Sequence, residues 1–169
     1  MADTSETIVK PGIEVLAENG FKELQGKRIG LITNPTGVDN NLRSTIDILA
    51  EAPGVKLTAL FAPEHGVRGD YVAGANVSNE VDKKTGVPVH SLHGRTRKPT
   101  SEMLKNVDAL VYDIQDIGCR SYTFISTMGL AMEAAARDGK EFYVLDRPNP
   151  LGGLRVEGNI VEKGRESFV

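Results

Sequence analysis

The feature that most constrains the fold is an alternation of short apolar runs with helical segments. Five runs are rich in Val, Ile and Leu and read as strands, at 27–33, 55–61, 87–92, 107–113 and 141–146. Nearly continuous apolar runs are typical of strands in a parallel sheet with both faces covered. Helices between successive parallel strands imply right-handed crossovers. The sequence therefore predicts an α/β fold: a doubly wound, mainly parallel, Rossmann-like sheet with helices on both faces.

The helices are expected where capping residues and apolar spacing agree. The first is predicted at 11–18, with proline at its start and Asn-Gly at its stop. A second is predicted to begin at a cap formed by Asp39 or Asn40 and to bury Leu42 on its apolar face. A short third helix is expected directly after Pro99.

The last helix and one long interval complete the prediction. Segment 122–138 is apolar nearly all round, so it is expected to pack deeply. Segment 62–86 has three early glycines and no convincing helical period. A loop of that length in a compact domain is usually functional or disordered.

Composition limits the classes of partner and the number of domains. A chain of 169 residues, 40% hydrophobic and 25% charged, has room for one ordinary domain, expected here at 8–169. The net charge of -3 argues against nucleic-acid partners, and the apolar runs are too short for a membrane span. A single cysteine excludes an internal disulfide and a cysteine-rich zinc site. No signal peptide is visible in residues 1–6, and the apolar ending at Phe168 favours a truncated domain.

Polar residues follow every predicted strand, which is where ligands bind in open parallel sheets. Because these ends meet at one edge, we expect the side chains to face one shared hollow. The candidates are Asn34 after the first strand; Glu64, His65 and Arg68 after the second; His93 and Arg95 after the third; Asp113, Gln115, Asp116, Arg120 and Tyr122 after the fourth; and Asp146, Arg147 and Asn149 after the fifth.

Glu64 is the first candidate for chemistry. Pro63 stiffens the exit from its strand, and Gly66 and Gly69 permit a sharp loop. A carboxyl group held in such a loop is partly desolvated, as a general acid requires. In the structural alternative, Glu64 pairs with Arg68 and only pins the loop.

No metal or cofactor is predicted. His65 has no second histidine two to four residues away, and Asp113 with Asp116 supplies too few ligands. The glycine fingerprints of dinucleotide and P-loop sites are missing, and Asn34-Pro35-Thr36-Gly37 could be only a turn. The many donors and acceptors after the fourth strand suit a polyhydroxylated ligand better.

Four ordered motifs carry a resemblance to a known family. They are GLITNPTG at 30–37, LFAPEHGVRG at 60–69, DIQDIGCRSYT at 113–123 and LDRPNPLGG at 145–153. Together they resemble the exo-β-N-acetylmuramidases, long catalogued as a domain of unknown function. The resemblance implies release of β-linked N-acetylmuramic acid from the non-reducing ends of peptidoglycan fragments, in cell-wall turnover or recycling, by an exported protein, periplasmic or secreted.

The resemblance also implies an architecture and a mechanism. Family members are about twice as long, with a C-terminal domain closing the cleft; that domain is absent here, so this chain alone is expected to turn over little substrate. Glu64 is expected to protonate the glycosidic oxygen, and Asp113 or Asp116 to position water or stabilise the oxocarbenium-like centre. Alternatively, the 2-acetamido group acts as internal nucleophile. The expected substrate-binding residues are Asn34, His65, Arg68, Gln115, Arg120, Tyr122, Asp146, Arg147 and Asn149, and the expected partner is a muropeptide or disaccharide.

Two other functions stay open at this point. One is a non-catalytic domain that binds muropeptides or other carbohydrates through the same groups. The other is a metal-dependent hydrolase of phosphate or amide bonds that uses Glu64, His65, Asp113 and Asp116.

Overall fold

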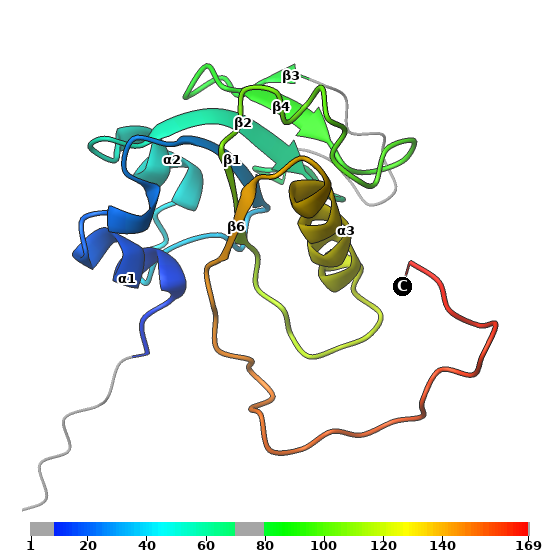
Figure 1. Cartoon of the computed structure of the whole chain (residues 1–169). Helices are drawn as coiled ribbons and strands as arrows, with labels where there is room; N and C mark the ends of the chain where they lie inside the picture. The colour runs from blue at the N-terminus through cyan, green and yellow to red at the C-terminus, as the bar shows by residue number, and fades with distance from the viewer. Residues whose placement is uncertain (1–8, 70–79, 169) are drawn as a thin grey trace, which may run out of the picture.

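A computed structural model describes residues 9–69 and 80–168, which form one six-stranded sheet (Figure 1). The strand order is β3-β4-β2-β1-β5-β6. All neighbouring pairs are parallel except β3 and β4, which are antiparallel. The strands are β1 (Arg28–Thr33), β2 (Lys56–Ala62), β3 (Glu80–Val81), β4 (Pro88–Ser91), β5 (Ala109–Asp113) and β6 (Glu141–Val144). The mainly parallel α/β sheet predicted from the sequence is confirmed.

Helices cover both faces of the sheet. They are α1 (Gly12–Glu18), α2 (Thr45–Glu51) and α3 (Phe124–Arg137), with a short 3-10 helix, η1 (Lys22–Leu24). Figure 1 shows α1 and α2 on one face and α3 on the other. Alternate residues of each strand accordingly enter separate cores: Leu31 packs in the core with Leu16 and Ile46, whereas Ile32 packs in the core with Ala134.

The expected start of α2 was wrong. Ser44 is the N-cap, and its side chain accepts a hydrogen bond from the backbone N–H of Ile46. Leu42 lies before the helix, 81% exposed, with a φ of 62°. Asp39 instead accepts from the N–H groups of Asn41 and Arg43. Its carboxylate therefore closes a local turn, which is the usual competitor of a helix cap.

The segment after Pro99 forms turns at 101–106 and no α-helix, so that expectation was also wrong. Thr100 does accept a hydrogen bond from the N–H of Met103, as a capping residue would. Leu104 is fully buried and joins the core on the α3 side. One apolar anchor holds this segment without a helix around it.

Helix α3 is one-sided, contrary to the expectation of deep packing. Its buried residues are Thr127, Ala131, Ala134 and Ala135. Ile125 and Met132 are 57% and 47% exposed. The helix forms an outer layer, and none of the helices among the described residues is long and apolar enough to cross a membrane.

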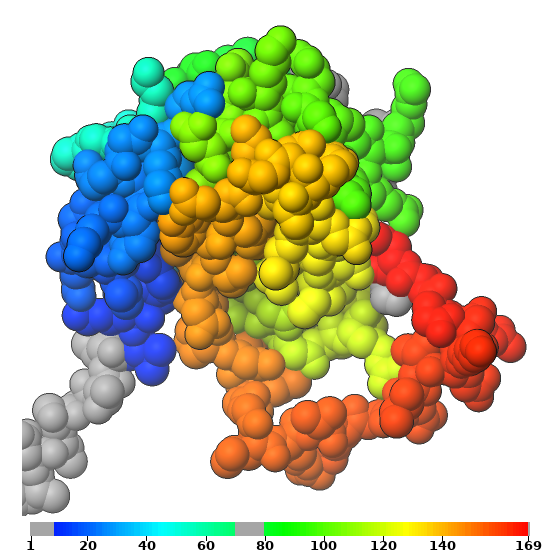
Figure 2. Space-filling model, viewed as in Figure 1, coloured from blue at the N-terminus to red at the C-terminus, as the bar shows by residue number. Residues whose placement is uncertain are grey.

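In the 62–86 interval, residues 70–79 fall outside the described part, and the short strand β3, which the sequence did not predict, follows them in the chain and joins the edge of the sheet. Residues 151–168 carry no helix or strand and extend beyond the body (Figure 2). This tail returns to the body through Arg97, whose guanidinium stacks 4.4 Å from the centre of the Phe168 ring.

The topology creates one switch point. Strands β1 and β5 are neighbours in the sheet. From β1 the chain continues to β2, on the side of β1 away from β5, and from β5 it continues to β6, on the side of β5 away from β1. Thr33 and Asp113, the last residues of these two strands, are paired in register. In open α/β sheets the ligand crevice forms where the strand order reverses in this way.

Candidate functional site

Asn34 begins a tight turn at the end of β1. The residue is 6% exposed, and its Oδ1 accepts hydrogen bonds from the backbone N–H of Thr36 (2.9 Å) and from the Thr36 hydroxyl (2.6 Å). The turn closes through Gly37, whose N–H donates to the Asn34 carbonyl. Asn34 is therefore held at the switch point by its own loop.

Asp113 ends β5 in a buried ion pair with Arg147. The Arg147 Nε lies 2.6 Å from Asp113 Oδ1, and its Nη2 lies 3.0 Å from Oδ2. The Thr45 hydroxyl, at the first turn of α2, donates to the same carboxylate, which is fully buried. Arg147 also donates to the carbonyl of Val38, at 2.7 Å. This geometry favours a positioning role for Asp113 over contact with substrate.

Gln115 and Asp116 lie just beyond β5 and are half-buried. The backbone N–H of Gln115 donates to the Thr36 hydroxyl at 2.9 Å, so the loops after β1 and β5 are joined. Among the described residues, Asp116 Oδ1 accepts one hydrogen bond, from the N–H of Gly118 at 2.6 Å. Burial raises the pKa of Tyr112, and the negative charges of Asp116 and Asp113 raise it further. Of the two aspartates, Asp116 keeps more of its oxygens available to a ligand.

Glu64 is half-buried in a constrained loop after β2. The next two residues, His65 and Gly66, have φ values of 73° and 77°. A left-handed histidine is uncommon, and such strain, about 1–3 kcal/mol, gathers at ligand sites. Val67 anchors the loop in the core. This anchored loop carries Glu64 and His65 at the carboxyl end of β2.

The loop of Glu64 adjoins the turn of Asn34. A Cβ added at Gly69 would lie 2.9 Å from Cγ of Pro35, so the Pro35 ring packs directly against the backbone of Gly69. This contact joins the loop after β2 to the turn after β1; that Glu64 and Asn34 serve one site stays a prediction.

Arg68 points into an ion-pair network under the loop. Its Nε lies 2.5 Å from Asp82 Oδ1, and its Nη2 lies 3.0 Å from Asp47 Oδ1. The hydrogen bonds from Arg68 hold the pKa of Asp82 well below its usual range. Burial raises the pKa of Asp47, but hydrogen bonds from Lys84 and Arg68 outweigh it and lower the pKa overall. Arg68 thus links α2 to the loop, and the structural alternative of an Arg68–Glu64 pair is not the arrangement found.

Three further candidates, Arg120, Tyr122 and Asn149, have the following surroundings. The Arg120 guanidinium donates to the carbonyl of Asn159 in the tail. Tyr122 is 46% exposed and its ring lies beside that of Phe124. The Asn149 side chain lies against Gly118: a Cβ added at Gly118 would lie 2.7 Å from the Asn149 amide nitrogen.

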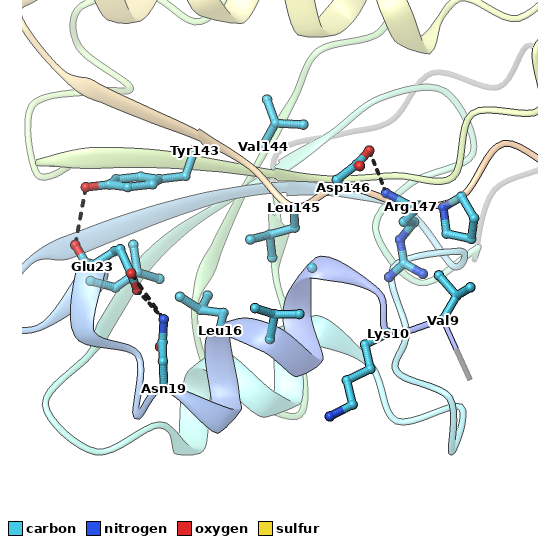
Figure 3. Close-up of a pocket in the computed structure, with 14 residues that line it drawn as sticks. Val9, Lys10, Leu16, Asn19, Glu23, Tyr143, Val144, Leu145, Asp146 and Arg147 are labelled. Atoms are coloured by element: carbon cyan, nitrogen blue, oxygen red, sulfur yellow. Dashed lines mark hydrogen bonds between the residues drawn. The ribbon is translucent and has the colours of Figure 1, made fainter. Parts of the chain in front are cut away.

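A separate hollow of about 500 Å³ lies between α1 and β6 (Figure 3). Of the predicted site residues only Asp146 and Arg147 line it. Asp146 accepts a hydrogen bond from the neighbouring N–H of Arg147, and the Tyr143 hydroxyl donates to the carbonyl of Glu23. The lining is mainly apolar, and the charged ends of Lys10 and Arg147 are engaged by Glu18 and Asp113 outside it, so the hollow does not suit a polyhydroxylated ligand.

The described residues contain no cluster of three or more His, Cys, Asp or Glu side chains that could hold a metal ion. Glu64, His65, Asp113 and Asp116 therefore do not assemble a metal centre within 9–69 and 80–168. Two network residues, Thr36 and Thr45, were not predicted from the sequence. Their hydroxyls gave no signal beyond their place after β1 and at the start of α2.

Comparisons with known proteins agree with this architecture. A family described as exo-beta-N-acetylmuramidase NamZ, N-terminal, matches residues 29–169. The peptidoglycan beta-N-acetylmuramidase NamZ of Bacillus subtilis (strain 168) is 61% identical over 161 residues, which are 95% of this chain and 39% of that protein.

Two solved structures of DUF1343 family proteins from Bacteroides fragilis NCTC 9343 are also similar. The first has 69% identity and a TM-score of 0.87, over 95% of this chain and 40% of its own. The second has 38% identity and a TM-score of 0.70, over 85% of this chain and 36% of its own. The chain thus spans about two fifths of the length of the relatives that it matches.

Proposed function

Since the chain belongs to the exo-β-N-acetylmuramidase NamZ family, as its N-terminal part, we propose that it forms the strand-edge half of a glycosidase active site. The reaction proposed is release of β-linked N-acetylmuramic acid from the non-reducing ends of peptidoglycan fragments, with a muropeptide or disaccharide as substrate. The observation that carries the proposal is the junction of the Glu64 loop with the Asn34 turn at the switch point. In this proposal a second domain closes the cleft, and the protein acts in the periplasm or after secretion, where intact peptidoglycan lies.

The environments of the three acid residues support different roles in this proposal. Glu64, in a half-buried loop after β2, is the general acid that protonates the glycosidic oxygen. Asp116 is the second carboxylate, which positions water or stabilises the oxocarbenium-like centre. The Asp113 oxygens are occupied by Arg147 and Thr45, so Asp113 supports the site from behind.

The test is Glu64→Gln in the complete gene product that carries this chain. Hydrolysis of an aryl β-N-acetylmuraminide should fall about 100-fold or more, because general acids contribute that much. Glu102→Gln is the matched control, since the Glu102 side chain is 85% exposed, and it should keep full activity. A wild-type protein that binds muropeptides without releasing N-acetylmuramic acid would favour the binding-domain alternative instead. Inhibition by a chelator would favour the metal-dependent alternative.

A further inference from the structure

Asn34 keeps one hydrogen-bonding atom free at the switch point. Its Oδ1 is the acceptor for the backbone N–H of Thr36, which can only donate, so the amide orientation is fixed. Asn34 Nδ2 donates no hydrogen bond to any described residue. Every buried polar side-chain atom of the described residues has a partner, so Nδ2, which has none, is not a buried atom. The Nδ2 donor therefore keeps some solvent-accessible surface although the residue is 6% exposed.

Gln115 keeps the opposite kind of atom free. Its Nε2 donates to the carbonyls of Asp116 (2.7 Å) and Pro148 (3.0 Å), and carbonyls can only accept. The orientation of this amide is fixed as well. Gln115 Oε1 has no partner among the described residues and, by the same reasoning, is accessible. It is an acceptor held still by two bonds on the other side of its amide.

Thr36 joins the two residues that carry this donor and this acceptor. Its hydroxyl donates to Asn34 Oδ1 at 2.6 Å and accepts from the backbone N–H of Gln115 at 2.9 Å. The Asn34 side chain and the Gln115 backbone are therefore bridged by one hydroxyl group, at the ends of two paired strands. Side chains fixed in this way lose little conformational entropy when they bind a ligand.

We propose that Asn34 Nδ2 and Gln115 Oε1 bind the acetamido group of the substrate. A secondary amide presents one acceptor and one donor. Its carbonyl accepts from Asn34 Nδ2, and its N–H donates to Gln115 Oε1. This inference rests on the proposed function and names the residues that distinguish a 2-acetamido sugar from a 2-hydroxy sugar.

The experiment compares the affinities of two monosaccharides, which removes any effect on the chemical step. N-acetylmuramic acid and its counterpart with a 2-hydroxyl group are titrated into the complete gene product, and each Kd is followed by NMR. Asn34→Asp keeps the acceptor for Thr36 and replaces the free donor by an acceptor. It should raise the Kd of N-acetylmuramic acid about 10-fold, the scale of a hydrogen bond to a ligand, and leave the Kd of the 2-hydroxy sugar within about threefold.

Gln115→Met is the second variant, because it removes the free acceptor with little change in side-chain length. It should reduce the preference for the acetamido sugar by a similar factor. Asn41→Asp, in an exposed turn, adds the same charge as Asn34→Asp and should leave the preference unchanged. Circular dichroism confirms that each variant is folded.

The outcomes separate this inference from the proposed function. Wild-type cleavage of an aryl β-N-acetylmuraminide combined with an unchanged sugar preference in both variants would overturn the inference alone. A wild-type protein that neither cleaves the muraminide nor binds either sugar would overturn both.

Discussion

Replacing Arg147 by Met tests the buried ion pair at the switch point. Arg147 and Asp113 have side chains that are 8% and 0% exposed, and two hydrogen bonds of 2.6 and 3.0 Å join them. Met keeps most of the aliphatic stem and removes the guanidinium. The Asp113 carboxylate would then stay buried with only the Thr45 hydroxyl as partner.

The cost of this substitution follows from burial. Removing one partner of a buried ion pair costs about 3–5 kcal/mol, because the remaining charge is desolvated without compensation. Arg147→Met also loses the 2.7 Å bond to the Val38 carbonyl, about 1 kcal/mol more. The combined loss is a large part of a typical unfolding free energy of about 5–15 kcal/mol. Arg147→Met is therefore expected to be folded but strongly destabilised.

The assay is urea unfolding at pH 7, followed by circular dichroism with linear extrapolation. The double variant Asp113→Asn with Arg147→Met should be about 1–3 kcal/mol more stable than Arg147→Met alone, since the uncompensated charge is gone. Arg43→Met is the control: Arg43 and Glu51 form an ion pair with side chains 49% and 65% exposed, worth at most about 1 kcal/mol. A loss below about 1 kcal/mol in Arg147→Met, or no recovery in the double variant, would refute the reasoning.

Two further predictions concern carboxylates in other settings. The Arg68 hydrogen bonds lower the pKa of Asp82 in the folded state, so its contribution to stability is present above the unfolded pKa of about 3.9 and is lost as pH falls through the lower folded value. Asp82→Asn should therefore cost about 2–3 kcal/mol at pH 7, and urea unfolding should show this difference shrinking below about pH 4. Asp116→Asn keeps an acceptor for the N–H of Gly118, so its unfolding free energy should stay within about 0.5 kcal/mol of wild type while kcat on an aryl β-N-acetylmuraminide falls about 100-fold. Normal kcat in Asp116→Asn would remove Asp116 from the mechanism. Asp113→Asn, in contrast, should lower the unfolding free energy, because Asp113 is the residue held in the buried ion pair.

The sheet was predictable because burial on both faces leaves a local signal in the sequence. Strands β1, β2 and β5 are largely apolar and buried, whereas β4 and the edge strand β6 are less so, and the five predicted strands agree with the observed ones to within two residues. Helix starts were less predictable. Asp39 and Ser44 are both good capping residues, and only the tertiary structure decides that Asp39 closes a turn and Ser44 begins the helix. The exposed face of α3 was likewise invisible, since composition does not reveal that a helix lies in an outer layer.

The site was predictable as a location and less so as a set of roles. Strand periodicity indicates which way Asp113 faces. Ala109 and Val111 face the side of α1 and α2, and because alternate residues of a strand share a face, Asp113 faces that side too. That side leads to the start of α2, where Thr45 lies. The partner Arg147 is 34 residues away, and no local pattern indicates the pairing.

The stretch Asn34-Pro35-Thr36-Gly37 shows how a simple turn builds a site. A Cβ on Gly37 would lie 2.1 Å from the Thr33 hydroxyl, so only glycine lets the turn fold back onto the end of its own strand. Pro35 packs against the loop that carries Glu64, and Thr36 reaches across to the loop after β5. Each of these contacts uses a part of the turn other than the Asn34 amide nitrogen. The bonds that close the turn engage Asn34 Oδ1, and they leave the amide nitrogen of Asn34 without a partner among the described residues.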